Sequence, residues 1–248
     1  VCVTETPLAA DLMQAIAAEM NLSETAFAVP LDRQGGYSLR WFTPEKEVPL
    51  CGHATLATAA ILYEYFKEKG KELRFQTLSG VLKTRYLEGA NEMDFPFYHP
   101  PPISLPEETL RSLALPAIRD SRYAAELRYW LFSLESEEEV RRYKPDFSHW
   151  KSLVFPCEVS GIILTAESGG EHDFVSRFFA PWLGVDEDPV TGSSHTVLGP
   201  YWQEKTGKRR LRAYQCSKRG GEMLLTVQEE RVRIEGRYAL VLEGVLKA

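Results

Sequence analysis

The chain carries one sequence plan twice, and this internal duplication limits what it can fold into. The stretch RWFTPEKEVPLCGHATLATAA, which begins at Arg40, resembles RFFAPWLGVDEDPVTGSSHTVLGP, which begins at Arg177. A repeat of this length is too long for a solenoid unit and predicts two similar domains related by pseudo-symmetry. The aligned pairs are Arg40 with Arg177, Phe42 with Phe179, Pro44 with Pro181, Pro49 with Pro189 and Gly52 with Gly192.

Strand-like and helix-like segments alternate in each half, which predicts a mixed α/β (α+β) fold. Helices are expected over residues 7–21, from Ala54 to Lys69, and from near Gly192. The proline-rich stretch YHPPPISLPEE, residues 98–108, suits neither a central strand nor a helix interior. We therefore expect an N-terminal domain over residues 1–100 and a C-terminal domain over 101–237, with 238–248 packing back onto the first.

Composition excludes several classes of partner. The 29 Lys and Arg residues against 35 Asp and Glu residues leave a net charge of −6, which provides no basic field for nucleic acid. No apolar run approaches the roughly 20 residues that a membrane span requires. The four cysteines form no Cys-x-x-Cys pair and the five histidines show no ligand spacing, so we expect a reduced, cytoplasmic protein without a metal site.

Two short motifs stand at the start of the two small-residue helices. Residues 51–53 read Cys-Gly-His and residues 191–193 read Thr-Gly-Ser, and the duplication places them at matching positions. Backbone N–H groups and the positive end of the helix dipole point out of such a helix start, and glycine allows close approach. If the two halves face each other, the paired helix starts suit a small substrate that bears a carboxylate.

Asp188 and Pro189 precede the second motif and have two interpretations. An Asp followed by Pro is typical of a helix N-cap and first helical position, so capping alone explains the pair. Alternatively, Asp188 holds a proton or binds the substrate at the helix start.

Glu24 is the third candidate, in the stretch NLSETAF, where it follows Ser23. A glutamate in such a position is usually a solvated loop charge. The apolar residues around this one predict partial desolvation, which raises a carboxyl pKa and makes the group a usable general acid or base.

These motifs together resemble the PhzF-like family of cofactor-independent isomerases, which share the diaminopimelate epimerase fold. The shared stretches are NLSETAF, RWFTP, VPLCGHATLA, SRFFAPW, EDPVTGSSH, PYW, QCSKRGG and RVRIEG. The resemblance implies two similar domains, each a curved, mostly antiparallel sheet wrapped around a central helix, a homodimer, and no cofactor or metal. It implies catalytic roles for Glu24, His53 and Asp188, and substrate binding by Ser23, Gly52, Gly192 and Ser193.

The sequence departs from the family pattern at its start. The family's first strand and a Gly-Asn-Pro turn that contributes to its site would precede Val1. The chain opens in strand-like sequence without a Met, so we expect the natural N-terminus to lie upstream.

Three functions remain open at the level of sequence. A single glutamate that removes and returns a proton on one face of a planar intermediate isomerises its substrate without inverting it. A two-base racemase or epimerase would use Cys51, but the duplication places Thr191 opposite it, and a threonine hydroxyl is too weakly acidic to replace a thiol. A catalytically silent binding protein on the same fold is the third possibility.

Overall fold

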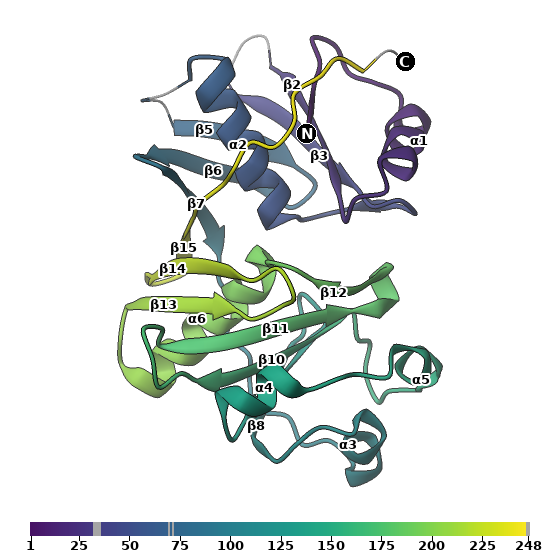
Figure 1. The fold of residues 1–248 in the computed structure, drawn as a ribbon, viewed down its shortest axis with the longest axis vertical. Helices are drawn as coiled ribbons and strands as arrows, with labels where there is room; N and C mark the ends of the chain where they lie inside the picture. Colours follow the sequence, from purple (N-terminus) through teal and green to yellow (C-terminus); the bar gives the residue numbers. More distant parts are fainter. Residues whose placement is uncertain (32–35, 69, 71, 247–248) are drawn as a thin grey trace.

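The computed structural model describes residues 1–31, 36–68, 70 and 72–246, and it divides into two halves of similar plan (Figure 1). The N-terminal half carries two helices and seven strands among the described residues. These are α1 (Ala10–Met20), α2 (Gly52–Tyr65), β1 (Cys2–Val3), β2 (Thr25–Pro30), β3 (Tyr37–Phe42), β4 (Glu47–Val48), β5 (Glu72–Thr77), β6 (Gly80–Leu87) and β7 (Ala90–Pro96).

The C-terminal half carries four α-helices, one short 3₁₀-helix and eight strands in the described chain. The helices are α3 (Glu107–Leu113), α4 (Glu137–Arg142), α5 (Phe147–Ser152), η1 (Pro181–Leu183) and α6 (Gly192–Thr206). The strands are β8 (Ile118–Ala124), β9 (Tyr129–Leu134), β10 (Gly161–Glu167), β11 (Phe174–Ala180), β12 (Val185–Asp188), β13 (Arg210–Gln215), β14 (Gly221–Val227) and β15 (Arg231–Gly236).

The predicted α/β architecture is confirmed, and the duplicated sequence forms the same unit in both halves. β3 pairs antiparallel with the short β4, and β11 pairs antiparallel with the short β12. In each unit an arginine on the longer strand binds a glutamate on the shorter one through two hydrogen bonds: Arg40 to Glu47 at 2.7 and 2.8 Å, and Arg177 to Glu187 at 2.7 and 3.0 Å. This pairing fixes the chain that leads into each central helix.

The two central helices pack into the sheets of their halves, and their first turns consist mostly of small residues. α2 packs against β2, β6 and β7, and α6 packs against β13, β14 and β15. All residues of α6 from Gly192 to Trp202 are buried. Hydroxyl groups on these helices are satisfied locally; Thr55 and Thr58, for example, donate to carbonyls four residues earlier, so a polar residue costs little in the core.

The sheets of the two halves are joined along one edge. β7 pairs antiparallel with β15, with Met93 opposite Ile234, so one continuous path of strands runs from β1 to β8, with β4 and β12 paired beside it. Residues 98–108, where we expected the domain boundary, lie between β7 and the first turn of α3 and contain one isolated bridge, from Pro102 to Arg122. The halves are thus connected by backbone hydrogen bonds as well as by this linker.

The segment after β15 runs back along the N-terminal half (Figure 1). There the Tyr238 hydroxyl donates to the Glu64 carboxylate of α2 at 2.9 Å. Residues 247 and 248, part of the segment expected to pack there, lie outside the described residues. So does Lys69, the expected end of the helix that the structure ends at Tyr65. No helix in the described part of the chain is long and apolar enough to cross a bilayer.

Candidate active site

Ser23 and Glu24 lie in the short turn between α1 and β2. Asn21 ends α1 in the left-handed conformation, with φ of 48°, which redirects the chain toward the sheet. β2 starts at Thr25, directly after Glu24, and its first four residues are buried. Glu24 therefore lies beside the core, and its side chain is 14% exposed. The expectation of partial desolvation is met by this position.

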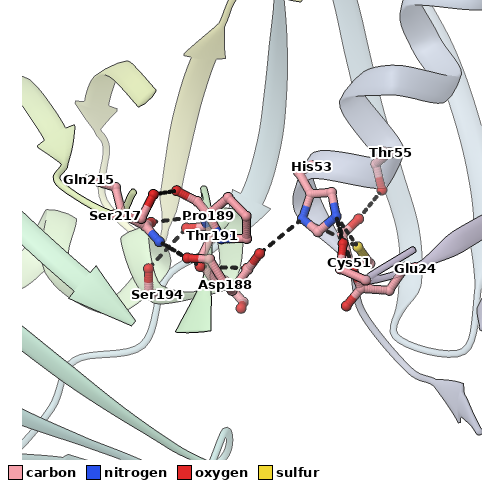
Figure 2. Close-up of polar contacts among 12 residues, drawn as sticks. Glu24, Cys51, His53, Thr55, Asp188, Pro189, Thr191, Ser194, Gln215 and Ser217 are labelled. Carbon is pink, nitrogen blue, oxygen red and sulfur yellow. Dashed lines mark hydrogen bonds and ion pairs between the residues drawn. The ribbon is translucent and has the colours of Figure 1, made fainter. Parts of the chain in front are cut away.

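His53 lies in the first turn of α2, and its imidazole contacts both Ser23 and Glu24. Its Nε2 atom lies 2.9 Å from Glu24 Oε2 and 3.3 Å from Ser23 Oγ. The Cys51 sulfur lies 3.8 Å from both ring nitrogens (Figure 2). The imidazole is therefore the centre of the N-terminal half's contribution to the site.

Asp188 reaches the same imidazole from the C-terminal half (Figure 2). Its Oδ1 atom lies 3.9 Å from His53 Nδ1 and has no hydrogen-bond partner among the described residues. Its Oδ2 atom accepts a hydrogen bond from the Thr191 hydroxyl at 2.6 Å. The capping interpretation was wrong, because α6 has Thr191 as its N-cap and the Asp188 side chain binds a hydroxyl rather than a helix N–H.

The chain around Asp188 is held by Gln215, a residue that the sequence motifs did not single out as part of the site. Its amide donates to the Asp188 carbonyl at 2.6 Å and to the Thr191 hydroxyl at 3.1 Å, and it accepts from the Thr191 N–H at 2.8 Å. Ser217 donates to the Pro189 carbonyl at 2.7 Å. The only signal for this role was the presence of Gln215 in the repeated part of the sequence.

The starts of α2 and α6 meet at Gly52 and Gly192. Neither N-cap residue, Cys51 or Thr191, makes a side-chain capping bond. Both helix starts therefore keep backbone N–H groups available where the halves adjoin.

Ser193, in the first turn of α6, pairs with Tyr129. The two hydroxyl oxygens lie 3.2 Å apart, and both side chains are nearly fully buried. Tyr129 lies in the sequence LRYWLF, which looks like any core strand, so pattern reasoning missed it.

The charges of the site separate its two carboxyl groups. Burial opposes ionisation of Glu24, but the neighbouring His53, through hydrogen bonding and its imidazolium charge, and Ser23 lower the pKa of Glu24 below its usual value. The expectation of a raised Glu24 pKa was therefore wrong, because the contact with His53 outweighs burial. Burial, with the negative charge of Glu24, raises the pKa of Asp188. Asp188 is therefore the more easily protonated carboxyl group of the two.

The surroundings raise the pKa of both His53 and Cys51, which favours a charged imidazolium and a neutral thiol. Burial disfavours the imidazolium, yet Cys51, Glu24 and Asp188 together raise the pKa of His53 well above its usual value. Burial raises the pKa of the Cys51 thiol to about 11. At pH 7 the cysteine is a neutral thiol, so the two carboxylates are the charges that stabilise the imidazolium.

Glu24, Cys51 and His53 also have the donor types of a metal centre. One ligand atom from each lies within 4.8 Å of the other two, and no other such cluster occurs among the described residues. However, a tetrahedral zinc ion would hold its nitrogen and oxygen ligands about 3.3 Å apart, and the Nε2 to Oε2 distance is 2.9 Å. The geometry fits a direct ion pair better than a metal centre.

A cleft of about 1230 Å³ opens beside the site. His53 and Gly192 form part of its lining, together with α2 residues Leu56 and Ala57 and the β14 residue Met223. The imidazole can therefore be reached from outside the protein, whereas Cys51 is 5% exposed.

Comparisons with known proteins agree with this fold. Residues 1–244 match the family model described as phenazine biosynthesis-like protein. The chain is 44% identical over 266 residues to the mouse phenazine biosynthesis-like domain-containing protein 2, covering all of this chain and 92% of the relative. It is 46% identical over 241 residues to an uncharacterized isomerase of Pseudomonas aeruginosa, covering 97% of this chain and 88% of that protein.

A solved structure shows the same architecture. The PhzF-family phenazine biosynthesis protein of Enterococcus faecalis is 43% identical and superposes with a TM-score of 0.86, covering 95% of this chain and 86% of that one. The fold defines a two-part α/β protein of the type seen in that solved structure. The chain belongs to the phenazine biosynthesis-like (PhzC-PhzF) family.

Proposed function

We propose that this protein is a cofactor-independent isomerase that moves a proton between two carbons of a small substrate bearing a carboxylate. Glu24 is the acid and base in this proposal. The observation that carries it is the contact of Glu24 with His53 at 2.9 Å, with Asp188 3.9 Å from the other nitrogen of the same ring. Two carboxyl groups with pKa values displaced in opposite directions flank one cation, an arrangement typical of acid–base sites.

In the proposed reaction, the Glu24 carboxylate removes a proton from a substrate carbon that is acidified by a neighbouring carbonyl or carboxyl group. The electron pair of the broken C–H bond moves into an enolate or extended enolate. Glu24, now protonated, returns the proton to a different carbon on the same face of the substrate. A double bond of the substrate shifts, and the Glu24 carboxylate is regenerated.

The other groups stabilise the charges of this cycle. The His53 imidazolium lies beside Glu24 and stabilises negative charge as it develops on the substrate oxygen. Asp188, the more easily protonated carboxyl group, hydrogen-bonds a hydroxyl or amino group of the substrate through its unpartnered Oδ1. The starts of α2 and α6, with Ser23, Gly52, Gly192 and Ser193, bind the carboxylate.

The racemase alternative is less well supported. Cys51 is buried, with a pKa of about 11, and its counterpart Thr191 uses its hydroxyl to bind Asp188 at 2.6 Å. Neither group is a ready base.

We further propose that the protein acts as a homodimer with a small-molecule substrate.

Hydrogen–deuterium exchange tests the proposal. The protein is incubated in heavy water with a panel of small carboxylates that carry acidic C–H bonds, and deuterium incorporation is followed by NMR. Wild-type protein should exchange at least one compound, Glu24→Gln should not, and Glu19→Gln, at an exposed glutamate of α1, should exchange it at the wild-type rate. Equal exchange by wild type and Glu24→Gln would refute the assignment of Glu24, and no exchange across the panel would favour a silent binding protein.

A further inference from the structure

Tyr129 is a buried group beside the site that the mechanism above does not use. It is the first residue of β9, and 8% of it is exposed. The charges of Asp188 and Glu24 act on its phenol, which places Tyr129 near the groups of the site, although it comes from a strand without a motif.

The ring of Tyr129 is fixed by packing. It lies against Phe178 of β11, with ring centroids 4.8 Å apart. Gly161, its register partner on β10, makes room for both rings: a Cβ atom there would lie 2.5 Å from the Phe178 ring and 3.2 Å from the Tyr129 ring. The phenol oxygen is therefore held in one position, 3.2 Å from Ser193 Oγ.

The hydroxyl of Ser193 differs from those of its neighbours on α6. Ser194 donates to the Thr191 carbonyl at 2.9 Å, and Thr196 donates to the Ser193 carbonyl at 2.6 Å, which is the usual local bonding of a helical hydroxyl. Within the described residues Tyr129 is the hydrogen-bond partner of the Ser193 hydroxyl.

The 3.2 Å distance allows either hydroxyl to be the donor, and the state of the phenol determines whether Tyr129 is able to donate. Burial, opposed by the bond to Ser193 and assisted by the negative charges nearby, raises the pKa of Tyr129 to about 12, so the phenol keeps its proton. A phenol that donates to Ser193 Oγ leaves the serine's own hydrogen free to point at another acceptor. The Ser193 O–H is then a further hydrogen-bond donor beside the backbone N–H groups at the start of α6.

We propose that Tyr129 is a positioning residue, which donates to Ser193 and thereby directs the Ser193 hydroxyl toward the carboxylate of the substrate. The inference rests on the function proposed above and adds to it the group that orients the carboxylate donor. The bound carboxylate keeps its charge throughout the reaction, so this contact is made equally in the ground state and the transition state. Its loss raises KM and leaves kcat nearly unchanged.

A double-mutant cycle tests this inference on the compound that the wild-type protein exchanges. Tyr129→Phe keeps the ring and its packing and should raise KM about tenfold, the effect of one neutral hydrogen bond. Ser193→Ala should raise KM by at least as much, and Tyr129→Phe should have no further effect in the Ser193→Ala background, because the phenol would then have nothing to orient.

Tyr143→Phe is the matched control. It removes another buried phenol hydroxyl, one that donates to the Leu113 carbonyl in the separate core of the C-terminal half. This variant should lower the melting temperature without changing KM. Such a result separates a general loss of stability from a loss of substrate binding.

The outcomes are distinct. An unchanged KM in Tyr129→Phe, or equal increases of KM by Tyr129→Phe with and without Ser193, would overturn the inference while leaving the isomerase proposal intact. Because Ser193→Ala leaves the phenol and its packing in place, the cycle retains one arm that does not depend on the stability of the Tyr129 variant. Failure of the wild-type protein to exchange any carboxylate would overturn the proposed function and this inference with it.

Discussion

Gly52 and Gly192 touch across the junction of the two halves. A Cβ atom on Gly52 would lie 2.8 Å from the Gly192 Cα atom, and a Cβ atom on Gly192 would lie 3.0 Å from the Gly52 Cα atom. These are the same two residues that the internal repeat aligns. The halves therefore meet at these aligned positions through a backbone contact that only glycine permits.

Replacing either glycine by alanine should separate the helix starts. The added methyl group meets backbone atoms, which cannot move without shifting a whole helix, so Gly52→Ala and Gly192→Ala should each lower the free energy of unfolding by about 1–3 kcal/mol. Proton exchange should fall as well. Chemical denaturation measures the first effect, with Gly169→Ala as a control that places its methyl group in open space.

Asp188→Asn should lose activity without losing stability. An asparagine oxygen can still accept the Thr191 hydroxyl, and the change removes a buried carboxyl group whose ionisation is disfavoured by burial. We expect exchange to fall about 10- to 100-fold, as for loss of a charged hydrogen bond to the substrate, and the melting temperature to stay level or rise. Asp186→Asn, at an exposed carboxylate paired with Lys151, should leave exchange unchanged; a large loss of stability in Asp188→Asn would indicate a structural role.

Cys51→Ala should keep most of the activity. The thiol is buried and neutral at pH 7, and an alanine fits the same space with a small loss of packing. Alkylation by iodoacetamide in the native state, followed by mass spectrometry, should modify Cys51 more slowly than the partly exposed Cys157. Rapid alkylation of Cys51 that stops exchange in a folded protein would restore the racemase interpretation.

The ion pair of Glu24 and His53 gives stability a specific dependence on pH. The pKa of His53 is raised above 6.5, so its contribution is complete below pH 6.5 and is lost as the pH rises through the higher folded-state pKa. The pKa of Glu24 is lowered below 4.5, so its contribution is present above pH 4.5 and is lost as the pH falls through the folded-state pKa.

His53→Gln should therefore lower the free energy of unfolding by about 1.5–3 kcal/mol at pH 6, the range for a hydrogen bond to a charged group. The difference from wild type should shrink as the pH rises. Denaturation curves over pH 5–10 test this, with His149→Gln, at an exposed histidine of α5, as the control. A difference that grows with pH would contradict the assigned direction of the His53 shift.

The repeated arginines should differ in their importance. The Arg177 side chain is 11% exposed and donates to the Val140 and Tyr143 carbonyls as well as to Glu187, whereas Arg40 is 35% exposed and binds Glu47. Lysine cannot reproduce a two-point guanidinium contact. We expect Arg177→Lys to cost about 2–4 kcal/mol of stability and Arg40→Lys less than about 1 kcal/mol; equal costs would show that the two units are energetically equivalent.

Sequence patterns predicted individual helices and strands, but they did not predict which of these elements pair with each other in the fold. The helix that starts at Gly192, the two strands that contain Arg40 and Arg177, and the membership of the family follow from local periodicity and motif order. The pairing of β7 with β15 did not, because it joins segments about 140 residues apart and no local property of either strand specifies its partner. Capping by Asp188 was wrong for a similar reason: the dipeptide Asp-Pro has a usual local role, and here a contact with Thr191 replaced it.

The sequence by itself determined the duplication, the two small-residue helices, and the identity of Glu24, His53 and Asp188 as candidates, since each depends on order and spacing along the chain. Only the tertiary structure decided that Glu24 and Asp188 lie on opposite sides of one imidazole, and that Tyr129 reaches Ser193. These relations depend on distances of a few ångströms between separate elements. Burial and neighbouring charges, which set the pKa values of such a site, arise only when those elements pack together.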